Sequence, residues 1–548
     1  MERSQMEETD VLVIGSGIAG LSAALYSAMG GVKVTLATAV HLFSGSTFFP
    51  GTWGFGLVGP ESEEDEEEFI KTILSLGKGV ALPSLVRTFV EKVNGSVDEL
   101  EAMGLTLLKP SSEKEGEKEY IPCFDHKHRR WRGLTKKNLL EVMPGLLAKH
   151  GVTIRPFHKA LELTKDNERI SGAFFIKEGK ELVHIRAKAV ILATGGLSGL
   201  YKYRLTTDDV TGTGVGMALR AGAKTVNLEF LQKMIGFVTP GPKTVHNEKT
   251  FEASNFYTGS GEDLLKKRLP EGISKEEVLK LRALHGPFST ETDSKYLDLA
   301  LHEELQESGQ KGVLLRYDAE KVKAQGEFVK TYFDWLKEEK GVSMDEDIHV
   351  APYMHASNGG LLIDEKARTS LEGLYAAGEC TGGMHGADRV GGLSTANGIV
   401  FGKIAGIEAA SYSRKRGYQS GNQEELKNLK VSSKTGRKEL QDALYAHAFL
   451  SVTEESIEKA ERVLDKITFT TEESSTAKEL EDAYSLLNEK AAAAVLLQSI
   501  IERKESRGSF YRKDYESHRS DFDRPLVGTF SEGKPQASFY SEGEVTSW

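Results

Sequence analysis

The chain has 548 residues, of which 39% are hydrophobic and 28% are charged, so it is a globular protein with enough sequence for two or three domains. Its formal net charge of −11 and the lack of a basic stripe argue against a nucleic-acid partner, because binding phosphates needs clustered lysine and arginine. The only cysteines, Cys123 and Cys380, lie far apart in the sequence, which excludes a disulfide framework and an intrinsic iron–sulfur cluster.

The first elements predict a doubly wound α/β sheet. Residues 10–15 have the pattern of a buried parallel strand and are followed by a helix rich in alanine, leucine and serine, and then by a second strand at 33–37. Strand-like runs recur at 188–193 and 373–377, and each ends in a turn of small residues. We expect one parallel sheet assembled from these distant segments.

The acidic run Glu63–Glu68 directly follows Ser62. Serine is a preferred residue at a helix start, and the helix dipole favours carboxylates in the first turn. We therefore interpret this run as the solvated start of a helix rather than as a functional site.

Composition divides the remainder of the chain. Residues 233–347 carry more charge and amphipathic helices, and strand signals return only after them. The pattern of 436–520 is helical, with a long helix over 480–501, whereas the tail 521–548 has no periodicity and predicts a loop or an arm over the surface. The predicted divisions are a sheet domain in two parts, 1–232 and 348–420, an inserted domain, a helical domain and the tail.

The N-terminal residues 1–10 are polar and acidic, unlike a signal peptide. The longest apolar stretches are too short and too rich in glycine to cross a bilayer. Two unpaired cysteines fit a reducing compartment, so we expect a cytoplasmic protein with no transmembrane segment.

A glycine motif, Gly15-Ser16-Gly17-Ile18-Ala19-Gly20, lies between the first strand and its helix. Gly15 permits a tight turn, Gly17 lets the backbone approach a pyrophosphate, and Gly20 allows close packing of helix against strand. The helix N-terminus, at Ile18 and Ala19, supplies N–H groups to the phosphates. In this context the motif predicts a bound dinucleotide.

The acidic residue that usually follows the second strand is missing, and the sequence there reads Ala37-Thr38. The Thr38 hydroxyl remains able to bond to a ribose, but a simple NAD site is disfavoured, and arginines that would bind NADP are absent there too. The later run Gly212–Gly216 is not a second dinucleotide motif, because it lacks a preceding strand and the third glycine at the correct spacing.

Several further motifs, in their order and spacing, resemble the flavoprotein subunits of succinate dehydrogenase and fumarate reductase and also L-aspartate oxidase. The resemblance covers nearly all of the chain except the insert and the tail. The motifs are Gly45-Ser46-Thr47, Ala193-Thr194-Gly195-Gly196, Glu229-Phe230-Leu231-Gln232, His355-Ala356-Ser357-Asn358-Gly359-Gly360, Gly373-Leu374-Tyr375-Ala376-Ala377-Gly378-Glu379, His385-Gly386-Ala387-Asp388-Arg389, Glu505-Ser506-Arg507-Gly508 and Tyr511-Arg512.

This resemblance implies a two-part Rossmann-like FAD-binding domain, a mobile inserted α+β capping domain and a C-terminal helical domain. It places Glu379 at the ribityl chain or ribose of FAD and Ser394 near the flavin pyrimidine. Ser46 stands where the membrane-bound relatives attach the flavin covalently to a histidine. Serine cannot form that bond, so FAD is expected to be non-covalent. The other FAD contacts implied are Thr47, Thr194 and Gly195.

For catalysis, the resemblance matches His355 and Arg389 to the residues that bind a substrate carboxylate. The planar arginine fork suits both carboxylate oxygens, although either residue is open to a purely structural role. The family's His-Pro-Thr-Gly is replaced here by Lys233–Gly236, so one substrate histidine is gone, and His246 is a candidate replacement. Lys295 is the best match to the expected proton-shuttling arginine, and it equally fits the surface of an amphipathic helix.

The basic cluster His128–Arg132 resembles a family segment near the flavin entrance. It is open to two interpretations, a solvated turn or a second anion clamp. As a whole, the resemblance implies an FAD-dependent oxidoreductase that transfers hydride between flavin N5 and a small carboxylate-bearing molecule and exchanges electrons with a separate partner protein. The alternatives are amino-acid oxidation of the L-aspartate oxidase type and a non-catalytic subunit that holds FAD and relays electrons.

Overall fold

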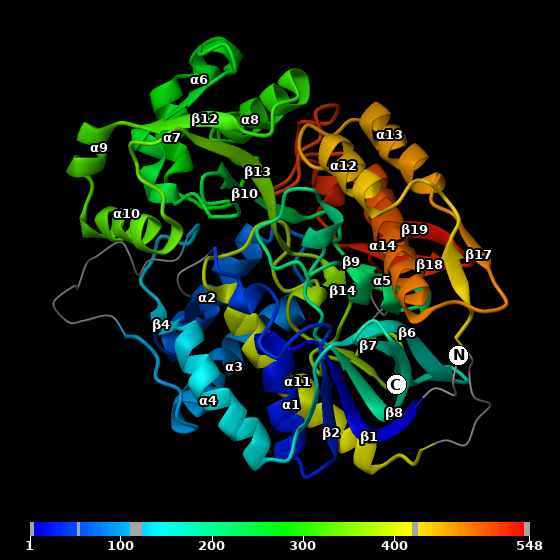
Figure 1. Cartoon of the computed structure of the whole chain (residues 1–548). Helices are drawn as coiled ribbons and strands as arrows, with labels where there is room; N and C mark the ends of the chain where they lie inside the picture. The colour runs from blue at the N-terminus through cyan, green and yellow to red at the C-terminus, as the bar shows by residue number, and fades with distance from the viewer. Residues whose placement is uncertain (1–4, 52–54, 110–122, 419–425, 542–547) are drawn as a thin grey trace.

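The computed structural model describes residues 5–51, 55–109, 123–418, 426–541 and 548, and its largest sheet joins strands from distant parts of the chain (Figure 1). The sheet has seven strands in the order β5-β2-β1-β8-β7-β6, with β15 beside β8. Strands β5, β2, β1, β8 and β15 run parallel, and β7 and β6 add an antiparallel extension. The strands are β1 (Gln5–Ile14), β2 (Val34–Ala37), β5 (Thr153–Arg155), β6 (His158–Asp166), β7 (Arg169–Lys177), β8 (Glu181–Leu192) and β15 (Leu374–Ala376).

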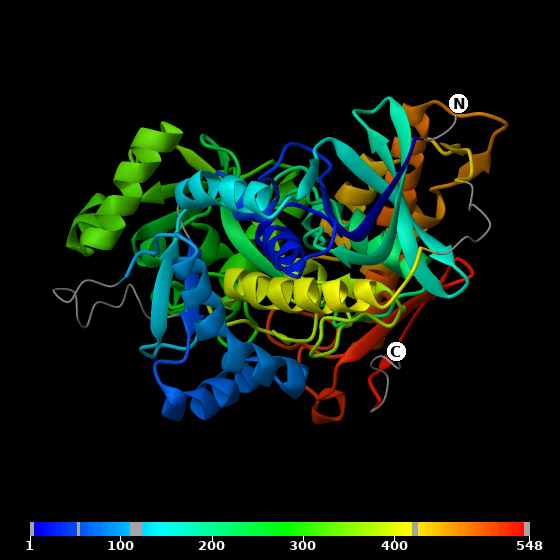
Figure 2. The same cartoon turned by 90° about the horizontal axis from the view of Figure 1, so that it is seen from below.

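All four predicted strands lie in this parallel sheet, which confirms the doubly wound pattern. Helix α1 (Ile18–Met29) packs against α11 (Leu393–Arg414), and the two helices lie side by side in Figure 2. Glycine makes this close approach possible, because a Cβ at Gly402 would lie 2.6 Å from the carbonyl oxygen of Ala19. The sheet and these helices share the main hydrophobic core.

The acidic run and the basic cluster bind one another. The predicted helix, α2 (Glu63–Leu76), begins after Ser62 and packs beside α3 (Pro83–Ala102), whereas α4 (Lys136–Lys149) contacts α1. Arg129 is buried and directly precedes β4 (Arg130–Leu134), which pairs with β3 (Phe55–Gly59). It forms ion pairs with Asp125 at 2.7 Å, with Glu68 at 2.6 Å and with Asp65. The acidic run is therefore more than a solvated helix start. The charge of Arg129 is already matched, so the structure does not support an anion clamp there.

The inserted segment, residues 233–347, has a hydrophobic core of its own. Its four-stranded sheet has the order β10-β13-β12-β11. Strand β10 crosses the predicted start of the segment and β13 begins directly after its predicted end, so these two strands carry the chain into and out of it (Figure 1, green). Its elements are β10 (Leu231–Thr239), β11 (Ser254–Tyr257), α6 (Leu264–Arg268), α7 (Lys275–Arg282), α8 (Lys295–Ser308), β12 (Val313–Tyr317), α9 (Ala319–Ala324), α10 (Glu327–Lys340) and β13 (Ile348–Ser357).

The C-terminal part is mainly helical up to residue 502. It contains α12 (Arg437–His447), α13 (Glu454–Asp465) and α14 (Ala477–Glu502), which includes the predicted helix over 480–501 and packs on α5 (Thr213–Arg220). A small strand pair, β16 (Leu429–Val431) and β17 (Phe469–Thr471), lies beside α14.

The prediction of a loop for the tail is wrong. Strands β18 (Leu526–Ser531) and β19 (Lys534–Phe539) form a hairpin, and β18 joins β9 (Thr225–Val226), itself paired with β14 (Gly360–Leu361). The turn residues Glu532 and Gly533 have φ values of 52° and 77°, as a two-residue hairpin turn requires.

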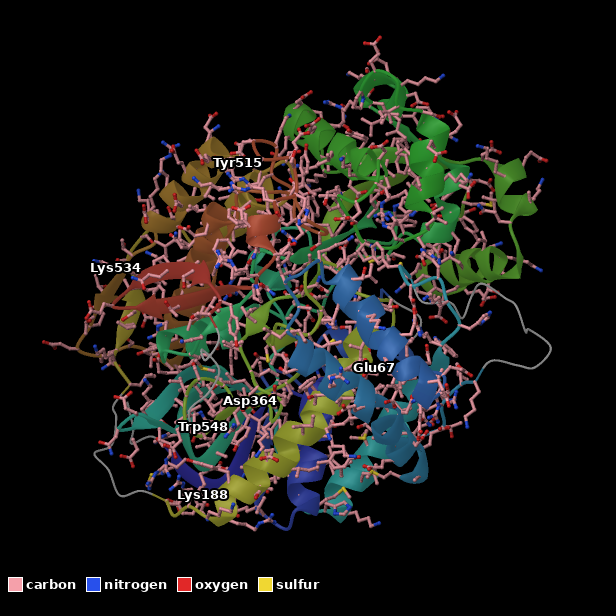
Figure 3. The ribbon with its side chains drawn as sticks, turned by 180° about the vertical axis from the view of Figure 1, so that it is seen from behind. Glu67, Lys188, Asp364, Tyr515, Lys534 and Trp548 are labelled. Atoms are coloured by element: carbon pink, nitrogen blue, oxygen red, sulfur yellow. The ribbon has the colours of Figure 1, made fainter. Side chains whose placement is uncertain are left out.

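The chain end returns to the sheet domain. The Trp548 ring packs against Tyr375 and Tyr412, and Arg368 links the Trp548 carbonyl oxygen to Asp364. Asp364 and Trp548 lie close together in Figure 3. Among the described residues, none of the helices combines the length and the apolar character needed to cross a membrane.

Candidate active site

A cavity of about 730 Å³ lies where the parallel strands end, between the sheet domain and the inserted segment. One side of it is formed by residues that directly follow β1, β2, β8 and β15, which is where open α/β sheets bind ligands. The other side includes Met234, Val245, Glu248, Gly286 and Pro287 from the inserted segment. One elongated ligand in this cavity would therefore contact both parts of the molecule.

The three glycines of the motif are needed for different structural reasons. A Cβ at Gly15, whose φ is 112°, would lie 2.2 Å from the Ala193 carbonyl oxygen, and one at Gly20 would lie 1.9 Å from the Gly15 carbonyl oxygen. These two glycines are required by the fold itself. At Gly17 the nearest atom is 3.5 Å away, an ordinary contact with Thr47 Oγ1, so the protein leaves room there. Gly17 lines the cavity, and this open cradle fits a bound pyrophosphate.

Where an acidic residue was missing from the sequence, the structure has three buried hydroxyl groups. The Ser16 hydroxyl donates to Thr38 Oγ1 at 3.0 Å, and Ser44 Oγ lies 3.2 Å from Ser16 Oγ and 3.3 Å from Thr38 Oγ1. Thr38 lines the cavity, so its hydroxyl is placed to bond to a ribose.

The predicted FAD contacts line the same cavity, except Gly20, which lies beneath it in the contact between helix and strand. Thr47 Oγ1 accepts a hydrogen bond from the Ile18 N–H at 3.0 Å, which ties the Ser46–Phe48 turn to the start of α1. Glu379 Oε1 accepts from the Ser357 N–H at 3.0 Å, and burial raises the pKa of this carboxyl group. The remaining lining residues among the predicted contacts are Ile18, Ala19, Ser46, Thr194, Gly195 and Ser394.

Arg389 and His355 both line the cavity, and Arg389 is held in position by an amide. Gln232 Oε1 accepts hydrogen bonds from Arg389 Nε at 3.1 Å and from Nη2 at 2.8 Å. Within the described part of the chain, no carboxylate lies within ion-pair distance of Arg389. Burial and the nearby arginine lower the pKa of His355 to about 3, so the imidazole is neutral at physiological pH. The site thus presents a fixed cation beside a neutral imidazole.

Two other candidates are not brought to the cavity. Lys295 is the first residue of α8 and lies over the Tyr296 ring, outside the cavity lining. His246 is buried inside the inserted segment against Phe251, and burial lowers its pKa to about 3. Neither contributes to the site in this conformation.

Sequence reasoning gave no role to four residues that hold Arg389 or line the cavity. Gln232 belonged to a recognised motif but had no role assigned to it. Met234 lines the cavity from the segment in which the family histidine is absent. Cys123 and Glu248 also line it, and no pattern in the sequence singled them out, because folding alone brings them there.

A buried lysine and a buried acid lie next to the site. Lys233 Nζ donates to the Ser509 carbonyl oxygen at 2.7 Å, and burial lowers its pKa to about 7. The Ser289 hydroxyl of the inserted segment donates to Asp388 Oδ2 at 2.7 Å. Burial also raises the pKa of Asp388 to about 8. Each group is thus held towards its neutral form because burial penalises charge.

The raised pKa of Asp388 makes stability depend on pH. Between pH 4 and 8 the folded protein keeps a proton that the unfolded chain releases, so this contribution to stability is lost as the pH rises through about 8. We expect the unfolding free energy of the wild type, relative to Asp388→Asn, to fall by up to about 1.4 kcal/mol per pH unit in that window. Urea unfolding at several pH values measures this fall in unfolding free energy. Asp345→Asn, at an exposed position, is the control, and parallel curves for wild type and Asp388→Asn would contradict the prediction.

A second prediction concerns the attachment of FAD. Ser46 lines the cavity, and its hydroxyl cannot replace the histidine that carries a covalent flavin. Acid precipitation should therefore release all of the yellow colour into the supernatant. Flavin that stays with the precipitated protein through repeated washing would show a covalent bond formed by another residue.

Comparisons with known proteins agree with this geometry. Residues 10–395 match the family described as FAD binding domain, and residues 437–531 match the family described as fumarate reductase flavoprotein C-term. The chain is 27% identical to a subunit of the fumarate reductase (CoM/CoB) of Methanothermobacter marburgensis, over 96% of this chain and 97% of that protein. It is 28% identical to the L-aspartate oxidase of Clostridium perfringens, over 74% of this chain and 87% of that protein.

Solved structures show the same fold. FrdA of E. coli quinol fumarate reductase superposes with a TM-score of 0.77 at 22% identity, covering 99% of this chain and 98% of that chain. Mycobacterium smegmatis Sdh1 gives a TM-score of 0.77 at 22% identity, covering 98% and 94%. These findings confirm the resemblance and the fold class expected from the sequence. The chain therefore belongs to the FAD-binding domain family, and it is an FAD-dependent oxidoreductase of the fumarate reductase and succinate dehydrogenase flavoprotein type.

Proposed function

We propose that the substrate is a small carboxylate-bearing molecule, and that Arg389 and His355 bind its carboxylate at the end of the cavity next to the inserted segment. The observation that supports this proposal is how the Arg389 side chain is surrounded. Its side chain is half-buried, it is oriented by two hydrogen bonds to Gln232, and no carboxylate of the described residues lies within ion-pair distance of it, although Glu379 is near enough to act on its charge. A largely desolvated cation without a direct ion pair is costly, and a bound carboxylate would supply that contact.

Bound FAD supplies the two-electron chemistry, by accepting or donating the equivalent of a hydride. The chain's own residues bind and orient the substrate. Arg389 offers a planar fork to both carboxylate oxygens, and neutral His355 adds one hydrogen bond without a second charge. The inserted segment forms one side of the site and is tied to the sheet domain by the hydrogen bonds from Ser289 to Asp388 and from Lys340 to the Pro50 carbonyl oxygen.

The electrons are exchanged with a separate partner in this proposal. The sequence has two distant cysteines, too few for an intrinsic cluster, and no second dinucleotide motif. The similarity to a protein that is named as one subunit of a larger enzyme supports a partner chain. A cytoplasmic location is part of the same proposal.

A second candidate is amino-acid oxidation of the L-aspartate oxidase type, which the similarity to that enzyme supports. Adding carboxylates and amino acids to the FAD-loaded protein, and recording the flavin absorbance, tests both candidates. Bleaching by a carboxylate, or reoxidation of the reduced flavin by an unsaturated one, supports the proposal. Bleaching by L-aspartate alone would favour the second candidate, whereas reoxidation that depends on a partner and on no carboxylate would indicate a relay subunit.

Lys295 was expected from the resemblance as a proton donor, and its place outside the cavity lining predicts otherwise. We expect Lys295→Ala to keep turnover within about twofold of the wild type, as substitutions outside a site usually do. Steady-state kinetics with the best carboxylate of the panel measure this. A large fall in kcat with unchanged substrate binding would return Lys295 to the proton-donor role.

A further inference from the structure

The part of the cavity near Arg389 has a wall with almost no polar groups for an anion. We call Cys123, Met234, Glu248 and Gly286 the distal wall. A Cβ at Gly286 would lie 3.2 Å from Met234 Cε and 3.9 Å from Glu248 Oε2, so the thioether and the carboxylate meet at this glycine. The Gly286 N–H donates to Cys123 Sγ at 3.1 Å. The four residues therefore form one continuous surface.

The distal wall is connected to Arg389 through its neighbouring residues. The Cys123 carbonyl oxygen accepts a hydrogen bond from the Gly391 N–H at 3.0 Å, two residues beyond Arg389. Met234 follows Gln232, the residue that holds Arg389, by two positions on β10. A small molecule whose carboxylate is bound at Arg389 would thus direct its other end towards this wall.

Two nearby cations, Lys233 and Arg282, are turned away from the cavity. Lys233 Nζ is directed to the Ser509 carbonyl oxygen. Arg282 is fully buried and donates to Asp298 at 2.8 Å and to the Gly286 carbonyl oxygen at 2.7 Å, which satisfies it behind the wall. Of the inserted-segment residues that line the cavity in the described part of the chain, Glu248 is the charged one, and its charge is negative.

The remaining cations in the lining belong to the opposite end. Lys159 forms an ion pair with Glu481 at 3.2 Å, and Arg437 with Glu489 at 2.8 Å. Lys159 follows His158, whose N–H donates to the Thr38 carbonyl oxygen at the expected ribose. Among the described residues that line the cavity, the positive charge available to a substrate is therefore that of Arg389.

From this distribution of charge we infer that the pocket takes a monocarboxylate whose other end is uncharged and that it rejects dicarboxylates, with Met234 and Glu248 as the residues that set this specificity. The inference rests on the proposed function, because it assumes that one carboxylate is bound at Arg389. A second carboxylate would lose its hydration, meet no cation among the described residues of the distal wall and face the Glu248 carboxylate. A neutral end would pack against the polarisable Met234 thioether.

A matched pair of ligands tests the inference. Succinate and monomethyl succinate have the same carbon chain and differ in the charge of one end. With the FAD-loaded protein, we expect monomethyl succinate to bind at least about 100-fold more tightly than succinate, measured by flavin difference spectra and by the ligand-induced rise in Tm. Equal binding, tighter succinate binding, or tighter binding of 4-aminobutanoate than of the monoester would overturn the inference.

Two variants locate the effect in the distal wall. Glu248→Gln should raise the affinity for succinate about tenfold and leave that for monomethyl succinate within about twofold, because it removes only a repulsive charge. Glu252→Gln is the matched control on the same 3-10 helix, where Glu252 is exposed and outside the lining, and it should change neither. Weaker succinate binding in Glu248→Gln would overturn the role of Glu248.

The same titrations separate this inference from the proposed function. Arg389→Ala should abolish the binding of both ligands. If it does, and the wild type fails to discriminate between them, the substrate class is wrong while carboxylate binding at Arg389 stands. If monomethyl succinate binds equally well to Arg389→Ala, the proposed function itself fails.

Discussion

Replacing Gly17 with valine should give a folded protein that purifies without flavin. The Gly17 backbone, with φ −69° and ψ 179°, is accessible to any residue, and a Cβ there meets no protein atom closer than 3.5 Å. The branched side chain would instead fill the space in front of the α1 N-terminus, where the pyrophosphate of FAD belongs. We expect affinity for FAD to fall at least about 100-fold, which corresponds to about 2.7 kcal/mol.

Reconstitution of the apoprotein with FAD, followed by flavin fluorescence, measures this loss. Gly145→Val is the matched control, because Gly145 lies exposed on α4 with nothing within 4 Å of an added Cβ. Circular dichroism and the unfolding midpoint should be close to wild type for both variants. Normal FAD binding by Gly17→Val would mean that the pyrophosphate lies elsewhere in the cavity.

The sheet and the FAD end of the cavity were predictable because they depend on local sequence. A buried strand, a tight turn and a helix occupy adjacent residues, so the motif from Gly15 to Gly20 contains its own geometry. The distinction between Gly17 and the other two glycines needed the structure. It depends on Ala193 and Thr47, which are distant in sequence and meet the motif only in the folded chain.

The tail hairpin was missed although the sequence contains its turn. Glu532-Gly533 supplies the positive φ values of a two-residue turn, but only β18 pairs with β9, and the edge strand β19 alternates between exposed and half-buried residues. The hydrophobic signal was therefore too weak to find a strand. Tertiary pairing stabilises the hairpin here.

The residues proposed to bind the substrate could be predicted only through the family resemblance. Arg389 and His355 lie in recognisable motifs, whereas the Gln232 contact and the distal wall come from side chains that converge across the two parts of the molecule. Lys295 is the opposite case, and its role stays a prediction. A sequence match alone suggested a catalytic role, and the start of α8 places the side chain outside the cavity lining.

Arg389→Ala should leave FAD binding intact and remove most activity on the best carboxylate. Its guanidinium contacts Gln232 and lines the cavity near His355, so its loss removes the one unpaired positive charge available there among the described residues. Losing a charge-assisted contact of this kind costs about 2–5 kcal/mol, or roughly tens to thousands of fold in kcat/KM. Arg389→Lys should recover little, because a single ammonium cannot reproduce the fork.

The partner variant and a control complete this experiment. His355→Ala should have a smaller effect, because a neutral imidazole contributes one hydrogen bond, and the double variant should lose less than the sum of the two single effects, since both residues bind one carboxylate. Arg130→Ala removes an arginine paired with Asp98 outside the cavity lining and should be near wild type. Rapid-mixing measurements of flavin oxidation or reduction give each rate. If Arg389→Ala and His355→Ala turn over the substrate at normal rates, the carboxylate is bound elsewhere, and the family likeness describes the FAD fold alone.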